Sequence, residues 1–383
     1  MKIGIVCYPT YGGSGVIATE LGKALAKNNH EVHFISYAQP FRLDIFDENI
    51  YYHEVIVKEY PLFVHPPYIL SLAGKMVEVV QYQKLDILHV HYAVPHATAA
   101  DLARQILRSK GIYIPIVTTL HGTDINLVGK DENFAPIITH AINVSDGVTA
   151  VSQSLKDNTL AFFPEVTNEI TVIPNFIDLQ RFSYKEKNHF KKAIAPNDEK
   201  IIAHASNFRK LKRVDNVVRI FAEINARVPS KLLLIGDGPE RGKIEKLSRE
   251  LGLDSEVKFL GKQDAIEELL AVCDLFLMPS ETESFGLAAL EAMACQVPVV
   301  SSNVEGLPEV NIHGVTGYTA PPNNVSEMAA LSLLILENPE TLAQFRHNAL
   351  IQAQKFDIKN ILPQYEQYYQ HIVQKSKAQH PNA

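Results

Sequence analysis

Short apolar segments alternate with amphipathic ones along this chain, and they do so in two successive series. The first series has strand-like segments at residues 2–8, 32–36, 87–90, 114–120, 148–151 and 170–173. The second series has them at residues 201–206, 231–236, 257–260, 275–278 and 297–301. Helical patterns such as 15–28 and 214–226 lie between them. Strands that alternate with helices form parallel sheets with right-handed crossovers. The pattern therefore predicts an α/β protein with two Rossmann-like, doubly wound domains.

The length of 383 residues also exceeds that of most single domains. We expect an N-terminal domain at 1–175 and a second domain at 176–357, with the break near Pro174-Asn175-Phe176. A helical segment at about 358–383 could pack back on either domain, and we assign it to the first. Ligands of doubly wound sheets bind beyond the carboxyl ends of the strands, so a cleft between the two domains is the expected site.

Composition excludes several classes of protein. The net charge of −7 gives no basic surface for nucleic acid. No apolar stretch approaches the roughly 18 residues that a membrane span needs, and the first apolar run is too short for a signal peptide. Cys7, Cys273 and Cys295 are odd in number and widely spaced, as expected for buried thiols in a reducing compartment. We expect a cytoplasmic protein without membrane insertion, and a homo-oligomer stays open.

The segment Glu-Ser-Phe-Gly-Leu-Ala-Ala-Leu-Glu at 283–291 places two carboxylates eight residues apart. The apolar spacing after Gly286 predicts a helix, with Glu283 in the preceding loop and Glu291 just beyond the first turn. The free N–H groups at a helix N-terminus favour a phosphate. One carboxylate can then hold a ribose diol and the other a sugar hydroxyl, which indicates a nucleotide-sugar site. An ordinary amphipathic helix with two solvated glutamates is the alternative interpretation.

A glycine-rich loop, Gly12-Gly13-Ser14-Gly15, follows the first strand and opens the first helix, where backbone N–H groups can approach an anion. Residues 13–18 also match the dinucleotide-binding fingerprint, so an NAD-dependent enzyme is an alternative interpretation. The glycines lie four or more residues beyond the strand, however, and the second strand ends in Ser36-Tyr37 with no acid for a ribose. These two details disfavour NAD.

Four cations follow the first strand of the second series: Arg209, Lys210, Lys212 and Arg213. A run of charge is often only a solvated face. This run lies at a strand end that faces the expected cleft, where Arg and Lys can bind a diphosphate. The sequence does not assign the role among the four.

The segment Gly236-Asp237-Gly238 to Lys243 resembles a phosphate-binding P-loop. Its spacing is one residue too long, and Ile244 stands where Ser or Thr is required. A tight turn after a strand is the better interpretation.

A polar cluster at 118–124 ends another strand of the first series, and His89, His91, Tyr92 and His96 end the strand before it. Two histidines that alternate along a strand could bind a metal ion. No Asp-x-Asp or His-x-x-x-His motif accompanies them, so we expect no metal.

Taken together, these motifs resemble the retaining glycosyltransferases of family 4, which have the GT-B fold. The resemblance covers nearly the whole chain and rests on the glycine loop at 12–15, residues 121–124, the Arg209/Lys212 cluster, 236–240, 283–291, 306–309 and 314–317. Segments 7–9, 18–22, 40–42, 91–96, 118–124 and 206–213 are most similar to the branch of that family that acts in bacillithiol synthesis.

The resemblance implies transfer from UDP-N-acetylglucosamine to the hydroxyl of L-malate, with the α-configuration retained and no metal or other cofactor. Its implied catalytic residues are Arg209, Lys212, Glu283 and His121. Its implied donor-binding residues are Gly13, Ser14, Asn207, Ser284, Phe285, Gly286, Leu287 and Glu291. Tyr92, Thr119 and Arg42 are the candidates for the acceptor.

Two residues depart from the family pattern, because relatives usually have Gly where Gln296 and Glu305 stand. Gln296 is expected at a helix end that favours Gly, at a cost of about 1 kcal/mol. Glu305 is expected near the donor and could change the shape of its site.

Two other functions stay open at this point. One is a family 4 transferase with a glycan or lipid acceptor, although the first half shows no strongly basic, aromatic surface helix. The other is a regulator that binds a nucleotide sugar without catalysis, which the full set of Glu283, Glu291, Arg209 and Lys212 disfavours.

Overall fold

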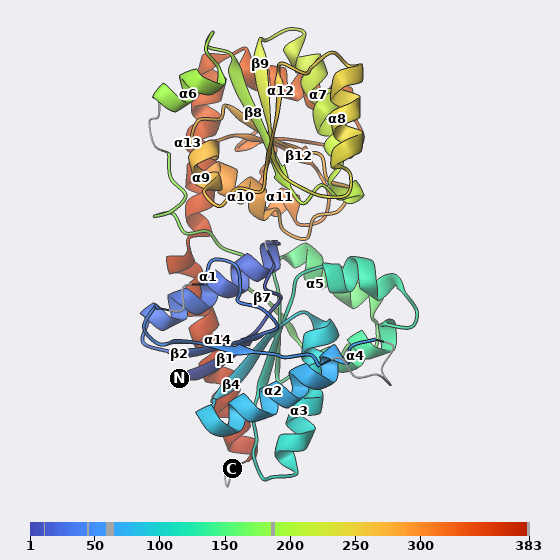
Figure 1. Cartoon of the computed structure of the whole chain (residues 1–383), viewed down its shortest axis with the longest axis vertical. Helices are drawn as coiled ribbons and strands as arrows, with labels where there is room; N and C mark the ends of the chain where they lie inside the picture. Colours follow the sequence, from blue (N-terminus) through green and yellow to red (C-terminus); the bar gives the residue numbers. More distant parts are fainter. Residues whose placement is uncertain (11, 44–45, 59–64, 185–187, 381–383) are drawn as a thin grey trace. The chain divides into compact units, whose positions relative to one another are not determined.

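The computed structural model describes residues 1–10, 12–43, 46–58, 65–184 and 188–380. The chain divides into two compact units, each described here by itself. Unit 1 is Met1–Asn175 with Ile358–Ala383, and unit 2 is Phe176–Asp357. In Figure 1, unit 1 comprises the blue-to-green elements and the red helix α14.

Unit 1 contains a seven-stranded parallel sheet in the order β3-β2-β1-β4-β5-β6-β7. Its strands are β1 (Lys2–Val6), β2 (Glu31–Ser36), β3 (Ile50–Glu54), β4 (Ile87–His91), β5 (Ile116–Leu120), β6 (Gly147–Ala150) and β7 (Ile170–Val172). Its α-helices are α1 (Gly13–Lys27), α2 (Tyr68–Gln83), α3 (Thr98–Arg108), α4 (Ala135–Val144), α5 (Gln153–Phe162) and α14 (Ile358–Gln379). The sheet reverses its order between β1 and β4.

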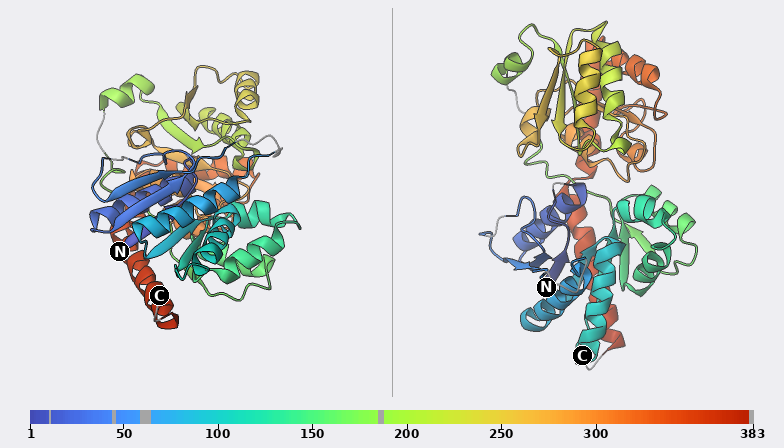
Figure 2. Two further views of the ribbon diagram at one scale, coloured as in Figure 1. Left: turned by 60° about the horizontal axis from the view of Figure 1, so that its bottom comes forward. Right: turned by 45° about the vertical axis from the view of Figure 1, so that its right-hand side comes forward.

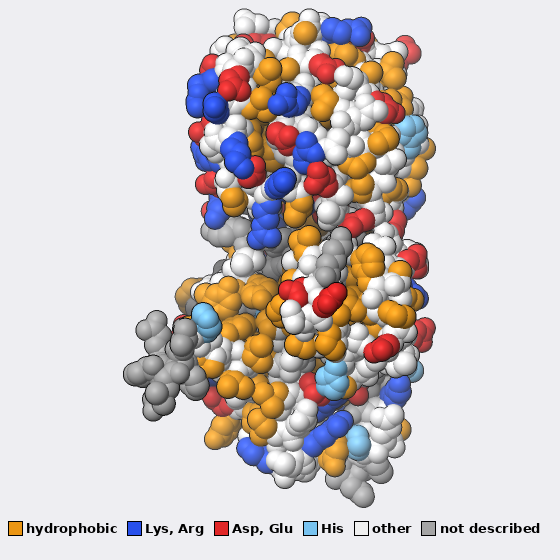
Figure 3. Space-filling view, turned by 90° about the vertical axis from the view of Figure 1, so that its right-hand side faces the viewer, with side chains coloured by type: hydrophobic (Ala, Val, Ile, Leu, Met, Phe, Trp, Pro, Cys, Tyr) orange, Lys and Arg blue, Asp and Glu red, His pale blue; other side chains and the backbone are white. Residues whose placement is uncertain are grey.

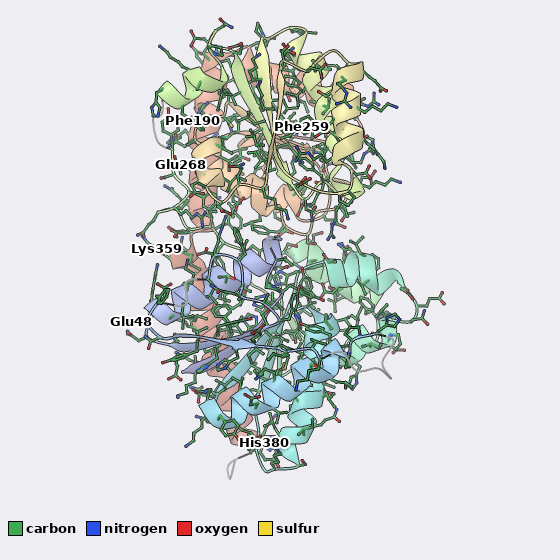
Figure 4. The ribbon with its side chains drawn as sticks, viewed as in Figure 1. Glu48, Phe190, Phe259, Glu268, Lys359 and His380 are labelled. Carbon is green, nitrogen blue, oxygen red and sulfur yellow. The ribbon has the colours of Figure 1, made fainter. Side chains whose placement is uncertain are left out.

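Helix α14 packs directly on the sheet of unit 1. A Cβ added to Gly147, the first residue of β6, would lie 2.8 Å from the Tyr368 hydroxyl. Tyr365 and Tyr369 on the same helix are fully buried. At its far end, His380 (labelled in Figure 4) stacks on Tyr113 with the ring centroids 4.1 Å apart. The last segment of the chain therefore completes the core of unit 1.

Unit 2 contains a six-stranded parallel sheet in the order β10-β9-β8-β11-β12-β13. The right-hand view of Figure 2 shows helices on either side of these strands. Its strands are β8 (Lys200–Ser206), β9 (Ser230–Gly236), β10 (Val257–Gly261), β11 (Leu275–Met278), β12 (Val299–Ser302) and β13 (Gly317–Ala320). Its α-helices are α6 (Asn188–Ile194), α7 (Val214–Asn225), α8 (Arg241–Glu250), α9 (Ile266–Leu270), α10 (Leu287–Ala294), α11 (Leu307–Val310), α12 (Val325–Leu336) and α13 (Pro339–Lys355). Phe208, Phe221 and Leu275 belong to one fully buried core cluster in this unit.

The prediction of two doubly wound parallel sheets is confirmed. Ligands of such sheets bind where the strand order reverses, at the carboxyl ends of the two strands involved. In unit 1 these strands are β1 and β4, and in unit 2 they are β8 and β11. The cleft expected between the two domains stays a prediction.

Three further expectations concern the cysteines, the membrane and surface charge. Cys7, Cys273 and Cys295 are free and buried, as predicted, and burial raises the pKa of Cys7 to about 12. Among the described helices, none is both long and apolar enough to span a membrane. On the face drawn in Figure 3, acidic and basic side chains are interspersed rather than gathered by sign.

Candidate functional site

Lys212 and Glu283 form an ion pair at the strand-order reversal of unit 2. Lys212 ends the short 3-10 helix η4 (Lys210–Lys212) after β8, and Glu283 lies in the loop after β11. Their side chains are only 19% and 15% exposed. The structure thus brings together two residues that the sequence placed 71 positions apart.

The backbone of Glu283 is held from the loop that precedes α11. Its N–H donates to Glu305 Oε2 at 2.7 Å, and its carbonyl accepts from the Gly306 N–H at 3.0 Å. A Cβ on Gly306 would lie 2.2 Å from the Ser284 carbonyl oxygen. The two loops therefore pack backbone against backbone, which a side chain at position 306 would prevent.

Helix α10 begins at Leu287 after a left-handed turn at Gly286, with φ of 99°. Gly286 provides no side-chain cap, so N–H groups of the first turn stay available for a ligand. Glu291 lies one turn into the helix and is 9% exposed. Phe285 is buried with its ring 5.5 Å from that of Phe356, so only its backbone can serve the site.

The four cations after β8 differ in their surroundings. Arg213 is held by Asp215, Glu281 and Asn323. This guanidinium stabilises the loop and has few donors left for a ligand. Arg209 and Lys210 are exposed, as is Asn207 before them. Within the described residues, the Arg209 side chain has no hydrogen bond or ion pair, so its charge is available.

The turn after β9 packs tightly against the loop after β8. Gly236 has φ of 118°, and a Cβ there would lie 1.8 Å from the Ser206 carbonyl oxygen. A Cβ on Gly238 would lie 2.1 Å from the Asn207 carbonyl oxygen. These glycines fit the predicted tight turn rather than a P-loop.

At the reversal of unit 1, the Tyr92 hydroxyl donates to Ser14 Oγ at 2.5 Å. Tyr92 follows β4, and Ser14 is the second residue of α1 after β1. Gly13 begins that helix, and a Cβ on Gly15 would lie 2.6 Å from the Thr10 carbonyl oxygen. The glycine loop thus lets α1 start close to the strand end.

A pair of histidines lies beside Tyr92. His91 Nδ1 and His121 Nε2 are 2.8 Å apart, and the ring centroids of Tyr92 and His121 are 5.1 Å apart. Burial lowers the pKa of His121 to about 3 and that of His91 well below its usual value. Both rings are therefore neutral at pH 7, and a single N–H joins them. His121 borders this site as an uncharged hydrogen-bonding group.

The Thr119 side chain lies on the same face as His89 and His91, one step deeper in the sheet than His121. Tyr92 N–H donates to the Thr119 carbonyl oxygen at 2.8 Å, so their backbones are adjacent. The Thr119 hydroxyl is fully buried, 2.7 Å from His89 Nε2 and 2.6 Å from Thr149 Oγ1. His89 in turn bonds Tyr369 of α14 at 2.7 Å. The structure does not bring the Thr119 side chain into the cluster around Tyr92.

Arg42 lies in the loop after β2, with φ of 65°. Its guanidinium carbon lies 5.3 Å from the centroid of the Phe41 ring, and its carbonyl oxygen accepts from Lys23 Nζ at 3.4 Å. Arg42 lies near the middle of that loop, and its contact with Lys23 places it beside α1.

Three tyrosines that the motif analysis did not select surround Tyr92 and His96. The Tyr8 ring lies 4.5 Å from His96 and 5.7 Å from Tyr92, and Tyr37 lies 5.7 Å from Tyr68. Tyr8 ends one segment predicted as a strand and Tyr37 directly follows another, and that position was the available signal. They form an aromatic wall at the carboxyl edge of the sheet.

Asp124 lies under this wall and accepts hydrogen bonds from the N–H groups of Ala93 and Gly122 at 2.9 and 3.1 Å. Burial raises its pKa to about 6. It therefore joins the turns after β4 and β5. In the described part of the chain, no group of three or more His, Cys, Asp or Glu residues could hold a metal ion.

Comparison with protein families covers both units. Residues 11–181 match the model of Glycosyltransferase Family 4, and residues 185–352 match that of Glycosyl transferases group 1. The two matches together span most of the chain.

Two relatives extend over most of the chain. N-acetyl-alpha-D-glucosaminyl L-malate synthase of Bacillus anthracis is 47% identical over 379 residues, which is 98% of each chain. An uncharacterized glycosyltransferase of Methanocaldococcus jannaschii, MJ1607, is 31% identical over 86% of this chain and 87% of its own.

Two solved structures share the fold. Anabaena HepE in complex with UDP and glucose aligns over 97% of this chain and all of its own, with a TM-score of 0.82 and 22% identity. Sucrose-phosphate synthase of Thermosynechococcus elongatus covers 97% of this chain and 99% of its own, with a TM-score of 0.79 and 23% identity. With two parallel sheets, both family models and relatives that match along its length, the chain belongs to the family 4 glycosyltransferases of the GT-B fold.

Proposed function

We propose that this enzyme transfers N-acetylglucosamine from UDP-N-acetylglucosamine to the hydroxyl of L-malate, giving N-acetyl-α-D-glucosaminyl L-malate, the first step of bacillithiol synthesis. The observation that carries the proposal is the 47% identity, over 98% of both chains, to a synthase named for that product. Because its cysteines are free, buried thiols, we also place it in the cytoplasm.

The donor binds at the carboxyl edge of the unit 2 sheet in this proposal. Glu291 holds the ribose hydroxyls, since a carboxylate can accept from both groups of a diol. Glu283 holds hydroxyls of the donor sugar, with the backbone of Ser284 to Leu287 beside it. The start of α10 favours the diphosphate, because unpaired N–H groups and the helix dipole both attract an anion.

Lys212 and Arg209 carry the charge of the leaving group. Lys212 is already fixed at the strand-order reversal by its ion pair with Glu283. Arg209, three positions earlier in the chain, is exposed. As the bond from the anomeric carbon to the phosphate oxygen breaks, negative charge grows on UDP. Cations positioned beforehand stabilise that charge in the transition state.

No enzymic nucleophile is needed. The malate hydroxyl attacks the anomeric carbon from the face that UDP leaves, which retains the α-configuration. A departing phosphate oxygen takes the hydroxyl proton. Positioning the two substrates then supplies much of the rate enhancement. We propose that no bound metal takes part, so the rate should persist in a chelator.

The acceptor binds at the carboxyl edge of the unit 1 sheet. Tyr92 presents its hydroxyl group there and is held by a hydrogen bond to Ser14 of the donor-binding glycine loop, and Arg42 supplies the cation for a malate carboxylate. His121 borders the donor sugar as a neutral group, and the Gly13 backbone lies at the start of α1. We leave Thr119 out of the pocket, because its hydroxyl is buried and bonded.

UDP release from UDP-N-acetylglucosamine tests the proposal when it is measured with L-malate and with a panel of other acceptors, including a polyol phosphate and an oligosaccharide. Release that L-malate alone stimulates supports it. If a glycan or lipid acceptor stimulated the release instead, the acceptor assignment would change, but the enzyme would still be a transferase. Release that no acceptor changes would point to a protein that only binds the nucleotide sugar.

A further inference from the structure

Glu305 occupies a backbone conformation that residues with a side chain rarely adopt. Its φ is 46°, in the left-handed region that favours glycine. Gln296 at the end of α10 is in the same region, with φ of 59°. A glycine would be less strained at both positions, so the contacts of each side chain show whether it has a role at the site.

The Glu305 side chain has a defined contact at the donor site. Oε2 accepts from the Glu283 N–H at 2.7 Å, a charge-assisted hydrogen bond. The neighbouring Gly306 N–H donates back to the Glu283 carbonyl oxygen at 3.0 Å. Residue 283 is therefore held on both sides of its own backbone by two consecutive residues of one loop.

This clamp acts on the residue whose carboxylate pairs with Lys212. The direction of the Glu283 side chain depends on its backbone, and Glu305 fixes that backbone while Lys212 holds the carboxylate. Among the residues that the structure describes, Gln296 makes no comparable side-chain contact at the site, and its N–H donates to the Met293 carbonyl oxygen, as at an ordinary helix end. The two strained residues thus differ in what their side chains can do for the donor.

We propose that Glu305 is a positioning residue for the donor sugar, acting through Glu283. The inference rests on the proposed function, in which Glu283 binds the sugar hydroxyls. It assigns Glu305 to the sugar and not to the uridine, because the Glu305 carboxylate bonds the backbone of Glu283, whereas Glu291 lies one turn into α10. Removing the carboxylate should therefore weaken the binding of the intact donor and leave the binding of UDP unchanged.

Three variants test this assignment by calorimetry with UDP and with UDP-N-acetylglucosamine. Glu305→Gly removes the carboxylate and relieves the backbone. Glu305→Gln keeps an oxygen that can accept from the Glu283 N–H. Gln296→Gly is the matched control, because it relieves the same kind of backbone strain without touching Glu283. Thermal unfolding of each variant checks that it is folded.

We expect Glu305→Gly to lower the affinity for UDP-N-acetylglucosamine about tenfold, the effect expected when one charge-assisted hydrogen bond is lost. Its affinity for UDP should match that of the wild type, Glu305→Gln should recover most of the loss, and Gln296→Gly should change neither affinity. An equal loss for UDP and for the donor would mean that Glu305 only maintains the loop, which overturns the inference. Unchanged donor affinity in Glu305→Gly would overturn it too.

Failure of the proposed function is distinguishable in the same experiment. A wild type that binds UDP-N-acetylglucosamine but transfers nothing to malate loses its acceptor assignment, while the comparison of Glu305 variants stands. A wild type that does not bind this donor refutes the function, and the inference falls with it.

Discussion

The Lys212 ammonium and the Glu283 carboxylate pair with each other where the strand order of unit 2 reverses, between β8 and β11. Each residue follows one of these two neighbouring strands, so the parallel sheet itself sets their approach. A cation and a hydrogen-bond acceptor are thereby held at the point where doubly wound folds bind their ligands.

Lys212→Ala should lower kcat about 100-fold, the lower end of what one preorganised charge-stabilising group contributes. The substitution removes the charge that we propose stabilises the leaving group, and it also leaves Glu283 without its cation. Steady-state UDP release measures the effect. Lys246→Ala, an exposed lysine on α8, is the matched control and should retain full activity. Wild-type turnover in Lys212→Ala would remove Lys212 from the reaction.

Glu291→Ala should weaken UDP binding by about tenfold or more, because in the proposed site two hydrogen bonds from the ribose diol to this buried carboxylate are lost. Calorimetry with UDP alone measures this without any turnover. Glu250→Ala, at the exposed end of α8, removes an equal charge and should leave the affinity unchanged. If Glu291→Ala bound UDP as tightly as the wild type, the ribose assignment would be wrong.

Tyr92→Phe and Ser14→Ala should raise the KM for malate by similar amounts, about 3- to 10-fold each, since each removes one partner of the same hydrogen bond. The double variant should then be little worse than either single one, because the bond can be lost only once. Initial rates at saturating donor, measured for the wild type, the two single variants and the double variant, complete this double-mutant cycle. Fully additive losses would show that the two hydroxyls act independently.

The free energy of unfolding should fall as the pH drops below about 6.5, because several buried histidines stay neutral in the folded state. Burial lowers the pKa of His96 and of His204 to about 4, and that of His89 to about 3. The unfolded chain binds protons from about pH 6.5 downward, so each histidine costs about 1.4 kcal/mol of unfolding free energy per pH unit between the two pKa values.

Asp124 works in the opposite direction, because its folded pKa of about 6 lies above its usual value. It favours the folded state below pH 6, but it is one group against several histidines. Urea unfolding from pH 7.5 to 5 tests the sum. His204→Asn should reduce by about one the number of protons that the chain takes up on unfolding, so the free energy of unfolding should change less steeply with pH. A free energy of unfolding that stays constant over this range would contradict the neutral, buried histidines.

Gly147→Ala should destabilise the protein by about 1–3 kcal/mol, the usual cost of overpacking, because the added methyl group would lie 2.8 Å from the Tyr368 hydroxyl and 3.1 Å from Ile372. Gly74→Ala is the control in the same unit. Gly74 lies inside α2 with nothing within 4 Å, so alanine there should stabilise by about 0.5–1 kcal/mol. Equal effects of the two substitutions in chemical denaturation would argue against close packing of α14 on β6.

The strands that the sequence predicted are those with continuous apolar runs, as buried parallel strands require. β3, with the sequence Ile-Tyr-Tyr-His-Glu, and β13, with Gly-Tyr-Thr-Ala, were missed. Both lie at a sheet edge and carry polar or exposed residues, so composition alone does not distinguish them from loops.

The candidate site was predictable where it depended on strand ends and helix starts. Gly286 and Glu291 lie where the pattern placed them, and Gln296 has the left-handed conformation expected of a helix end. Contacts between distant loops were not predictable. Arg213 looks like Arg209 in the sequence, yet only the fold supplies its partners Asp215, Glu281 and Asn323.

Thr119 illustrates the limit of reasoning from a strand end. The family resemblance and its place in the polar segment that ends a strand made it a candidate for the acceptor pocket. The Thr119 hydroxyl bonds His89, which in turn bonds Tyr369 of α14. It therefore lies on the same face as His91 and His121 but deeper in the sheet, where α14 covers it. The sequence alone did not establish that α14 covers that face.

The most direct test of the central claim is identification of the product formed from UDP-N-acetylglucosamine and L-malate, by mass spectrometry and by the anomeric proton coupling in NMR. We predict a single product with the mass of N-acetylglucosaminyl malate and the small coupling of an α-glycoside, formed in step with UDP. A β-glycoside, or free N-acetylglucosamine at the same rate with and without malate, would contradict it.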